Sequence, residues 1–339
     1  MSKNLIATLD YPPKRGGVAQ YLHAIKSSFP DAFDVLFWRE HTPRYLMLLY
    51  ELYHASKPYR SVWISHITPV GTAAFVLKWF TKKPYVLFLH GMDYDLARRN
   101  PVRAALAKLI IKHADHTVCN SQSLADEVFT FAGVAPSVVY PSVSDALLVA
   151  ADQVAGRHDH FQANPVHLLT VGRLVARKGH EKVLRVLAQL PNLTYDIIGD
   201  GPERAHLLER ISTLGLESRV RIYSQVDDSD LPSFYASADL FVMPTTKTKK
   251  DREGFGTVYL EAQAFGVPVV ATNHPGVDEA VLDKETGLLV LDTDESLQAA
   301  IDQLAHDPGR RVEMGKAGRE RVLRLFTRAS QMRSIEKIL

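Results

Sequence analysis

The sequence predicts an α/β protein with two doubly wound domains, each built on a parallel sheet. Strand-like runs alternate with helical patterns along the chain, and this alternation is interrupted once. With 339 residues, of which 46% are hydrophobic and 23% charged, the chain is long enough to bury two cores. Such alternation favours parallel strands with helices on both faces, and a sheet of this kind binds its ligand at the carboxyl ends of its strands.

The first domain is predicted from six short apolar runs. They are Leu5–Leu9, Phe33–Trp38, Ser61–Ser65, Tyr85–Leu89, His116–Cys119 and Ser137–Val139. The stretch 141–165 has no sustained period and is the predicted linker. Six further runs predict the second sheet: Val166–Val171, Tyr195–Ile198, Val220–Tyr223, Leu240–Met243, Val267–Ala271 and Gly287–Val290. We therefore expect a first domain at residues 1–155 and a second at 156–325.

Composition excludes several classes of protein. No run approaches the length of a membrane-spanning helix, and the start of the chain does not resemble a signal peptide, so we expect a cytoplasmic protein. The single cysteine, Cys119, excludes an intrachain disulfide, and the 14 histidines include no metal-ligand spacing, so no metal site is predicted. A net charge of +2 argues against a nucleic-acid partner.

The segment that follows Leu240–Met243 contains the strongest candidate site. Gly254 and Gly256 allow a tight turn before the helical pattern that begins at Thr257. Free backbone N–H groups at such a helix start, around Phe255 and Thr257, favour an anion such as phosphate. Two carboxylates, Glu253 and Glu261, would repel a bare phosphate unless the ligand also offers hydroxyl groups. The pattern therefore favours a nucleotide sugar, with a charged loop and an exposed helical Glu261 as the alternative.

Other loops at strand ends of the second domain offer groups that suit the same ligand. Gly172 and Arg173 follow the first strand, and Lys178 comes five residues later. An arginine fork and a lysine point charge would neutralise a diphosphate. Gly199 ends the next strand, and Val226 lies in a loop whose backbone could contact a base, although neither of these two signals is specific.

The first domain supplies two weaker signals. Gly16 and Gly17 open a helix after the first strand, as in a phosphate loop, but they form neither a Walker motif nor GxGxxG, and a plain tight turn explains them equally. His90 leaves the fourth strand beside a glycine and would point toward a ligand, whereas a lone histidine often has a structural partner instead.

A predicted helix from Leu96 to Ala114 is basic and amphipathic. Its cations, with no acidic residue among them, are Arg98, Arg99, Arg103, Lys108 and Lys112. Such a helix suits peripheral contact with the inner face of an anionic membrane, binding of a phosphorylated acceptor, or a solvated outer surface. The aromatic stretch Tyr45–Tyr59 either adds to that contact or packs in the core. The loop Thr245–Arg252 carries three lysines and is either a lid over the ligand or a solvated loop.

The ordered motifs of the second domain resemble the retaining glycosyltransferases of family 4, which have the GT-B architecture of two facing Rossmann-like domains. The resemblance rests on Val171–Leu174 with Lys178–Gly179, Gly199–Pro202, Glu253 and Glu261 seven residues apart, Gly266–Thr272 and Gly287–Val290. Pro275–Gly276 stands where the family often has two glycines. In this architecture, residues 326–339 would form a helix that packs back on the first, acceptor-binding domain.

The resemblance implies a role for each candidate residue. Glu253 would contact the sugar hydroxyls, Glu261 the ribose, and the N–H groups around Phe255–Thr257 the diphosphate or the sugar. Arg173 and Lys178 would bind the diphosphate, Gly17 would close over the donor, and His90 would lie near the reacting sugar. Such enzymes need no metal or other cofactor and move a hexosyl unit from a nucleoside diphosphate sugar to a glycan or lipid-linked acceptor.

Two other functions stay open at this point. A nucleotide-sugar epimerase shares the architecture, and it would convert the sugar nucleotide without an acceptor. A non-enzymatic two-domain ligand-binding protein is the third reading, although such a protein would usually carry a signal peptide. Neither the donor nor the acceptor is identified by the sequence.

Overall fold

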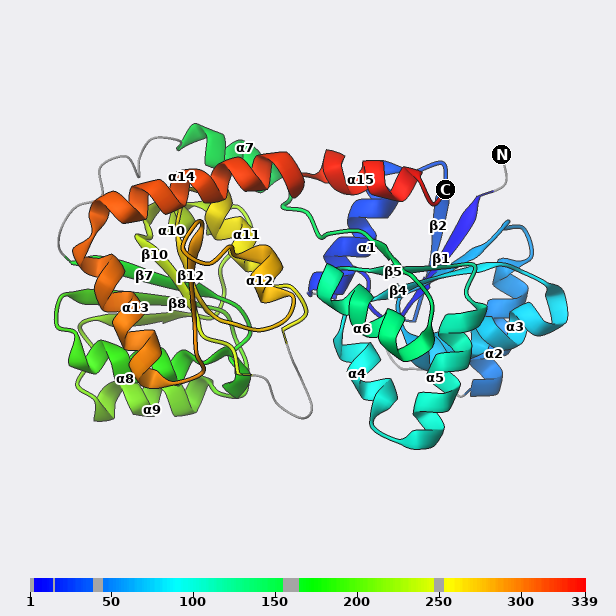
Figure 1. The fold of residues 1–339 in the computed structure, drawn as a ribbon, viewed down its shortest axis with the longest axis horizontal. Coiled ribbons are helices and arrows are strands. Elements are labelled where there is room, and N and C mark those ends of the chain that lie inside the picture. Colours follow the sequence, from blue (N-terminus) through cyan, green and yellow to red (C-terminus); the bar gives the residue numbers. More distant parts are fainter. Residues whose placement is uncertain (1–2, 15, 39–44, 155–164, 247–252) are drawn as a thin grey trace. The chain divides into compact units, whose positions relative to one another are not determined.

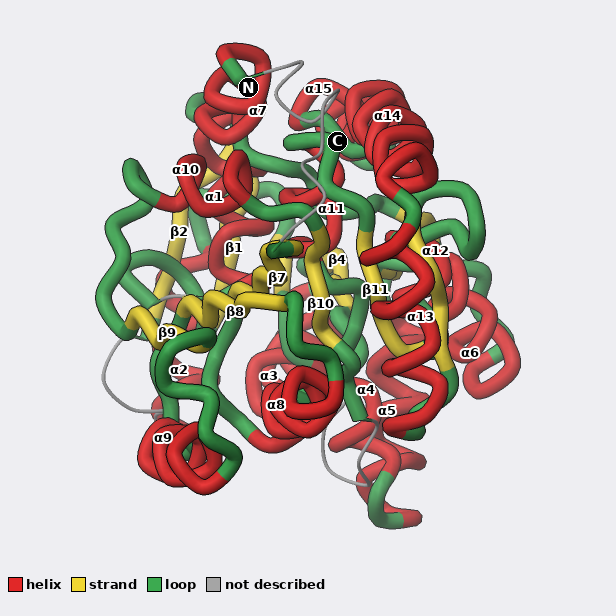
Figure 2. The backbone as a smooth tube through the Cα atoms, turned by 90° about the vertical axis from the view of Figure 1, so that its left-hand side faces the viewer, coloured by secondary structure: helices red, strands yellow, loops and turns green. Residues whose placement is uncertain are grey.

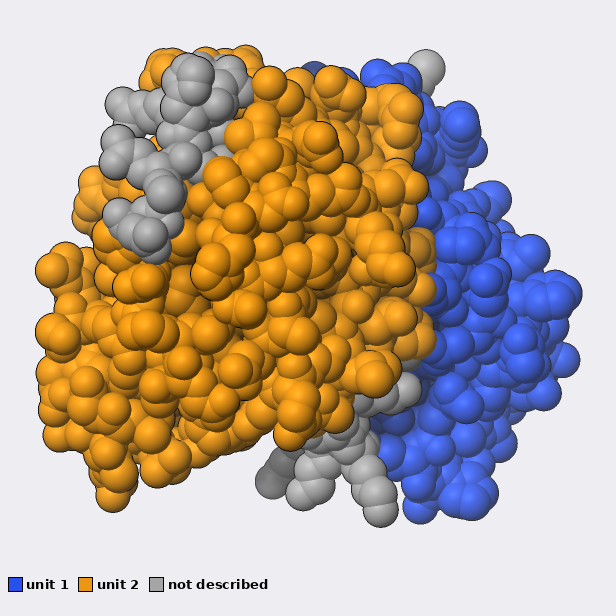
Figure 3. Space-filling model, turned by 60° about the vertical axis from the view of Figure 1, so that its left-hand side comes forward, with its two compact units in different colours: residues 1–141, 328–339 blue, residues 142–327 orange. Residues whose placement is uncertain are grey.

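The computed structural model describes residues 3–14, 16–38, 45–154, 165–246 and 253–339. The chain forms two compact units, which Figure 3 colours separately. Unit 1 comprises Met1–Pro141 and Arg328–Leu339, and unit 2 comprises Ser142–Thr327. Each unit contains one six-stranded sheet. The predicted α/β class with two doubly wound domains is confirmed.

The sheet of unit 1 is parallel and has the order β2-β1-β3-β4-β5-β6. Its strands are β1 (Asn4–Thr8), β2 (Phe33–Phe37), β3 (Val62–Ile64), β4 (Tyr85–Leu89), β5 (His116–Cys119) and β6 (Ser137–Val138). Each boundary lies within one residue of the predicted one. The strands are short apolar runs because both faces of a parallel sheet are covered by helices.

Helices cover both faces of this sheet. Those of unit 1 are α1 (Gly17–Ser28), α2 (Tyr45–Ser56), α3 (Thr72–Thr81), α4 (Met92–Arg98), α5 (Pro101–His113), α6 (Gln122–Ala132) and α15 (Arg328–Glu336). Side chains of α1 and α15 pack in one core cluster, and those of α2 to α6 pack in another on the opposite face. Figure 1 shows α15 alongside α1.

The sheet of unit 2 is also parallel, in the order β12-β11-β10-β7-β8-β9. Its strands are β7 (Val166–Val171), β8 (Leu193–Ile198), β9 (Val220–Tyr223), β10 (Leu240–Met243), β11 (Val269–Thr272) and β12 (Gly287–Val290). Figure 2 shows β9, β8, β7, β10 and β11 side by side in this order. The strand order reverses between β7 and β10, so the crevice of this sheet lies at the carboxyl ends of these two strands.

The helices of unit 2 lie on both faces of its sheet (Figure 1). They are α7 (Asp145–Gln153), α8 (His180–Gln189), α9 (Arg204–Thr213), α10 (Leu231–Ser237), α11 (Thr257–Ala264), α12 (Val277–Ala280), α13 (Asp294–His306) and α14 (Pro308–Leu325). Helices α8, α9 and α13 share a core cluster with the strands, and α11 packs against α14.

The structure corrects the predicted linker. Residues 145–153 form helix α7, which is capped by Ser144, whose Oγ accepts a hydrogen bond from the Leu147 N–H at 3.3 Å. This helix contacts α10 and α11, so the division between the units falls after Pro141, whereas the sequence placed it after residue 155. The apolar side of α7 is short, so the sequence shows only a weak helical periodicity there.

The predicted basic helix from Leu96 to Ala114 is in fact two helices. Helix α4 ends at Arg98, and Asn100 caps α5 by accepting a hydrogen bond from the Val102 N–H at 2.8 Å. Pro101 occupies the first turn of α5, where its missing N–H costs nothing. The Asn-Pro pair therefore starts a second helix within the segment that the charge pattern predicted to be a single helix.

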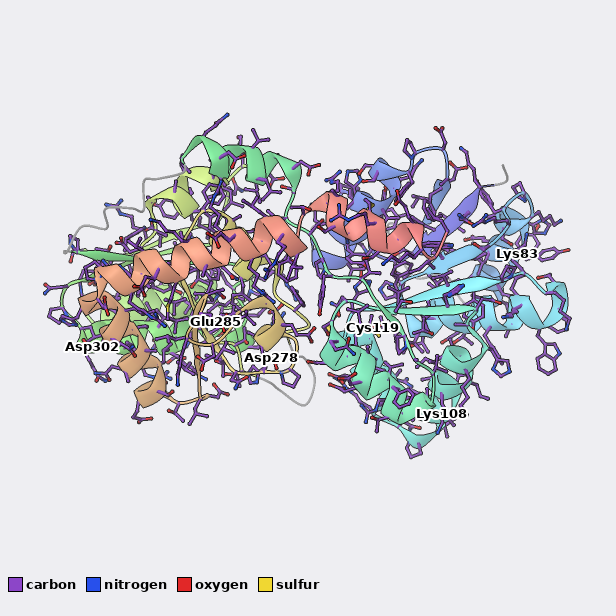
Figure 4. The ribbon with its side chains drawn as sticks, turned by 45° about the horizontal axis from the view of Figure 1, so that its top comes forward. Lys83, Lys108, Cys119, Asp278, Glu285 and Asp302 are labelled. Atoms are coloured by element: carbon purple, nitrogen blue, oxygen red, sulfur yellow. The ribbon has the colours of Figure 1, made fainter. Side chains whose placement is uncertain are left out.

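Two further observations concern single features of the chain. Cys119 is buried at the end of β5, as expected for a core residue (Figure 4). None of the helices in the described ranges is long and apolar enough to cross a membrane.

Candidate functional site

In unit 2 the predicted site residues gather at the carboxyl ends of β7 and β10, where the strand order reverses. The loop after β7 contains Gly172, Arg173 and a short 3-10 turn at Ala176–Lys178. The loop after β10 leads to Glu253 and the start of α11, although residues 247–252 with their lysines lie outside the described residues. Two loops far apart in the sequence thus meet because their strands are neighbours in the sheet.

Glu253 is the centre of this arrangement. Its Oε2 lies 2.7 Å from Lys178 Nζ and 2.8 Å from Arg177 Nη1, and all three side chains are largely buried. Burial alone would raise the pKa of Glu253, but the charges of Lys178 and Arg177 outweigh it and lower the pKa to about 2. Glu253 is therefore ionised throughout the physiological range.

One of the two cations that pair with Glu253 differs from those that the sequence singled out. Lys178 is buried and also contacts Met243 Sδ, at 3.3 Å, while Arg177, which was not a candidate, supplies the second ion pair. Arg173 is exposed, and no ion pair of its side chain is seen within the described ranges. The sequence did not single out Arg177 because residues 173–178 contain three cations, and the sequence does not show which of their side chains face Glu253.

The start of α11 has the geometry predicted for an anion site. Gly256, at φ +83°, precedes the helix, which has no side-chain cap, so its first N–H groups are not satisfied by a capping residue. A Cβ on Gly256 would lie 2.3 Å from the Tyr259 ring, and Tyr259 donates a hydrogen bond to the Met243 carbonyl at 3.1 Å. Phe255 packs edge-on against Phe326. The helix start is thereby fixed beside the end of β10.

Glu261 is half-buried and not an exposed helical residue. Its Oε2 accepts a hydrogen bond from the Tyr235 hydroxyl of α10 at 2.7 Å. Burial raises the pKa of Glu261, and the hydrogen bond from Tyr235 offsets part of that effect. Tyr235 thus holds this carboxylate in place, and the predicted contact of Glu261 with ribose stays a prediction.

The remaining candidates of unit 2 lie around this centre. A Cβ on Gly199 would lie 2.0 Å from the Gly172 carbonyl oxygen, so the loops after β7 and β8 approach too closely for any other residue there. Gly172 itself lies next to the Lys178 side chain. Gly254 and Val226 are half-buried, and Val226 follows β9. The roles of these four residues in donor binding stay predictions.

In unit 1 the structure brings together a pair that the sequence analysis did not single out. His66 Nε2 lies 3.1 Å from Asp10 Oδ2, and His66 Nδ1 lies 2.9 Å from Ser65 Oγ. Asp10 follows β1 and His66 follows β3, and the strand order of this sheet reverses between these two strands. The hydrogen bond with His66 lowers the pKa of Asp10. Polar residues directly after both strands were the available signal.

His90, the candidate after β4, interacts electrostatically with both members of this pair. Burial, and then the charge of His66, lowers the pKa of His90 to about 3. Its ring packs edge-on against Tyr21 at 5.1 Å, and its buried Nε2 has no hydrogen-bond partner in the described part of the chain. One oxygen of Asp93, Oδ2, is likewise buried without a partner there, while Oδ1 accepts from the His90 N–H at 3.1 Å.

The paired glycines of unit 1 lie at an exposed position, and the space around Gly16 is open, unlike that around Gly199 and Gly256 of unit 2. Gly16 and Gly17 are exposed at the start of α1, and a Cβ on Gly16 would meet no atom within 4 Å. Gly16 has φ +156°, which favours glycine. Closure of this turn over a donor stays a prediction.

Two family models match the chain and together span nearly all of it. Residues 157–321 match "Glycosyl transferases group 1", and residues 7–147 match "Glycosyltransferase Family 4". The chain belongs to glycosyltransferase family 4. This glycosyltransferase therefore carries its two matches on its two units, and the motifs around Glu253 fall within the first of these matches.

Curated relatives match this glycosyltransferase over most of its length or over about two thirds of it. One is the GDP-mannose-dependent alpha-(1-6)-phosphatidylinositol monomannoside mannosyltransferase of Mycolicibacterium smegmatis, 29% identical, covering 93% of this chain and 92% of the relative. Another is the lipopolysaccharide core biosynthesis glycosyltransferase LpsE of Rhizobium meliloti, 31% identical, covering 64% and 62%.

Solved structures agree with the GT-B fold of this glycosyltransferase. Anabaena HepE, solved in complex with UDP, superposes with a TM-score of 0.81 at 20% identity, covering 99% of both chains. Sucrose-phosphate synthase from Thermosynechococcus elongatus gives a TM-score of 0.78 at 21% identity, covering 99% and 98%. At these identities the likeness shows the fold alone.

Within the described residues, no group of three or more His, Cys, Asp or Glu side chains is arranged to hold a metal ion.

Proposed function

We propose that this glycosyltransferase moves a hexosyl unit from a nucleoside diphosphate sugar to a glycan or lipid-linked acceptor, with retention of configuration and without a metal. The observation that carries the proposal is the buried ion pair of Glu253 with Lys178 and Arg177, beside the start of α11. A fixed carboxylate next to backbone N–H donors suits a ligand that has both hydroxyl groups and phosphates.

Each group has a distinct task in this proposal. Glu253, ionised and held by its two cations, accepts hydrogen bonds from hydroxyls of the donor sugar. The N–H groups at the start of α11 and the exposed Arg173 bind the diphosphate, and their interaction strengthens as negative charge develops on the leaving group. Lys178 adds a positive charge to the site, and its Nζ is held by contacts with Glu253 and Met243.

The reaction then needs no side chain as general base. The bond from the anomeric carbon to the diphosphate oxygen breaks, and its electron pair leaves with the diphosphate. The acceptor hydroxyl oxygen attacks the same face of the sugar, and its proton passes to a leaving phosphate oxygen. Retention follows from attack on the face that the leaving group has just vacated.

The relatives suggest which substrates to test first. The mannosyltransferases of Mycolicibacterium smegmatis and Mycobacterium tuberculosis, similar over 92–93% of their length, are GDP-mannose-dependent and act on phosphatidylinositol monomannoside by their names. HepE was solved with UDP-glucose. GDP-mannose is therefore the first donor to test, and UDP-glucose is the second.

Peripheral membrane contact through the cations of the predicted basic helix stays a prediction, with one refinement. Arg98 lies over the Tyr94 and Phe131 rings, 4.9 and 5.3 Å from their centroids, and lies 3.7 Å from Glu127. It is therefore engaged within unit 1. Lys108 Nζ also lies 5.8 Å from the centroid of the Phe131 ring, so Arg103 and Lys112, exposed on α5, are the better placed of the five.

The proposal is tested in two steps. Thermal-shift measurements with guanosine, uridine and adenosine diphosphate sugars identify the donor, because ligand binding to the folded state raises Tm. The selected donor is then incubated with mannosylated phosphatidylinositol and with glycan acceptors, and the anomeric configuration of the product is read by NMR, with and without EDTA. An inverted product or loss of activity in EDTA contradicts the corresponding part of the proposal.

The two alternative functions give different results in the same experiment. An epimerase converts the sugar nucleotide when no acceptor is present, and a binding protein leaves donor and acceptor unchanged. Transfer of the sugar to an acceptor excludes both.

A further inference from the structure

Unit 1 exposes a large apolar surface on two adjacent helices, α2 and α3. It consists of large, exposed hydrophobic side chains of a kind that soluble proteins normally bury. We call this set the α2–α3 face: Tyr45, Leu46, Met47, Tyr50, Tyr53, Trp79 and Phe80. Leu46, Phe80 and Trp79 are 83%, 78% and 67% exposed. Among the described residues of unit 2, the exposed large hydrophobics are all aliphatic and are spread over α7, α9, α14 and the residue after β12. Such a concentration marks an interaction site.

Helix α2 carries large apolar side chains on both its inner and its outer side, which is unusual for a helix at a protein surface. Leu48 and Leu52 are fully buried on its inner side, while Leu46, Tyr50 and Tyr53 lie on its outer side. Its one carboxylate, Glu51, accepts a hydrogen bond from Trp38 Nε1 at 2.6 Å and so is used within the unit. A helix of this kind is normally covered by protein or lipid.

The two helices also form an open cavity between their exposed side chains. Leu46, Leu49, Tyr50 and Tyr53 of α2 and Leu77 and Phe80 of α3 line it, and its volume is about 330 Å³. Apart from Thr81, the lining side chains carry no polar group other than the tyrosine hydroxyls. The cavity therefore suits a hydrocarbon segment and offers no charge to bind a polar metabolite.

The surroundings of this face are basic. Between Tyr45 and Lys83 the sequence contains five Lys and Arg residues and a single acidic residue, Glu51. Lys57 Nζ lies 4.7 Å from the centroid of the Tyr53 ring, and the exposed Lys82 follows α3 directly, whereas Lys83 is half-buried and donates to the Tyr59 carbonyl. Lys57 and Lys82 stand at the border of the apolar face and give it a positive rim.

Helix α5 extends the positive region on the far side of α3. Phe75 of α3 contacts His113 of α5, with ring centroids 5.2 Å apart, and Lys78 donates a hydrogen bond to the His113 carbonyl at 2.8 Å. The exposed cations Arg103, Lys108 and Lys112 belong to α5. Figure 4 labels Lys83 beyond α3 and Lys108 on α5.

We propose that the α2–α3 face inserts into an anionic lipid bilayer, with the lysines of its rim contacting the lipid head groups. Tyrosine and tryptophan are the side chains that favour the boundary between hydrocarbon and water, and lysine reaches from there to phosphate. Both features favour anionic lipid over a second copy of the chain. A symmetric dimer through this face would bring like-charged rims together, and lysine is depleted at protein interfaces.

The proposal concerns a surface of unit 1 and does not rest on the proposed reaction. Its test is binding of the full chain to vesicles of phosphatidylcholine, with or without 30 mol% phosphatidylserine, followed by flotation. Trp79 is an internal probe, because Trp38 and Trp63 are buried, so a blue shift of the fluorescence reports insertion of this residue. We expect binding and a blue shift with the anionic vesicles and much weaker binding with the neutral ones.

Variants at exposed positions locate the contact. Leu46→Gln with Phe80→Gln should weaken vesicle binding roughly tenfold or more, because apolar area no longer leaves water. Lys57→Gln with Lys82→Gln should weaken it about twenty-five-fold, at about a fivefold loss for each cation. Leu208→Gln with Leu323→Gln is the matched control, since these exposed leucines lie on α9 and α14 of unit 2.

Three results would overturn the proposal. The first is no binding to anionic vesicles. The second is binding that persists after the Leu46 and Phe80 changes but is abolished by neutralisation of Arg103, Lys108 and Lys112, because this result would assign the contact to α5. The third is a dimer in sedimentation that the Leu46 and Phe80 changes convert to a monomer, together with no blue shift on vesicles, which would assign the face to a second copy.

Discussion

Lys178 Nζ and Glu253 Oε2 lie 2.7 Å apart, and they join the loop after β7 to the segment before α11. Both side chains are largely removed from water, with 9% and 13% of their side-chain surface exposed. An ion pair in such surroundings loses much of its hydration, so either partner left alone is strongly destabilising. Several expected outcomes follow from this pair and from the two reversal points of the sheets.

Replacement of Glu253 by Gln should affect both stability and catalysis. The amide leaves the charges of Lys178 and Arg177 without compensation, so we expect a loss of about 3 kcal/mol in the free energy of unfolding, measured in urea. We also expect transfer to fall roughly hundredfold or more, because the fixed negative charge toward the donor is lost.

Glu285→Gln is the matched control, because Glu285 is exposed on the turn before β12 (Figure 4). It should change neither quantity. If Glu253→Gln were as active as the unchanged enzyme, the central role of this carboxylate in the proposed function would be wrong.

The same ion pair predicts how stability depends on acid. The pKa of Glu253 is about 2 in the folded protein, below its usual value of 4.5, so this group stabilises the fold at pH values above 4.5. The stabilisation, about 3 kcal/mol, is lost as the pH falls from 4.5 toward 2. Urea unfolding at a series of pH values should therefore show a steeper acid loss than in Glu253→Gln. Parallel curves for the two proteins would contradict the assigned pKa.

The Asp10 and His66 pair predicts a defect that is separate from donor binding. Because both residues lie at the reversal point of the unit 1 sheet, where we expect the acceptor, His66→Gln should misplace the acceptor and lower the transfer rate at least about tenfold. It should leave the affinity for the nucleoside diphosphate unchanged by calorimetry. His306→Gln is the control, since His306 is largely exposed on α13. An unchanged transfer rate would reduce the pair to a structural contact.

Helix α15 predicts a contribution of the end of the chain to unit 1. Ile335 is fully buried in the core cluster that contains α1, so Ile335→Ala should cost about 2–4 kcal/mol of stability. Removal of residues 326–339 should cost more, because Met332 is lost as well, and it should also lower the transfer rate. Lys337→Ala changes an exposed position and serves as the control. Full stability after truncation would show that unit 1 does not need this helix.

Much of the fold was predictable from the sequence because its signals are local. Runs such as Val166–Val171 and Leu240–Met243 are short, apolar and bounded by polar loops, and they form β7 and β10 with the predicted bounds. Side-chain caps within a helix were less visible. The Asn100 cap divides the predicted helix after Arg98, and the Ser144 cap starts a helix inside the predicted linker.

The candidate site divides in the same way. Glu253, Lys178 and the Gly256 turn were identified from the sequence, since glycines and charges at strand ends are visible there. The partners were not. Glu253 pairs with Arg177, Glu261 with Tyr235 and Asp10 with His66, and each partner lies on a different loop or helix. The two residues of a pair are up to 76 positions apart, and a single sequence does not show that residues so far apart are in contact.

The sequence by itself determined the order of the strands along the chain, the family of the chain and the residue types at the strand ends, because periodicity, glycine spacing and motif order are properties of neighbouring residues. Only the tertiary structure decided which of those residues meet. The reversals of strand order between β7 and β10 and between β1 and β3 bring their loops together, and the charges of Lys178 and Arg177 then keep the buried Glu253 carboxylate ionised.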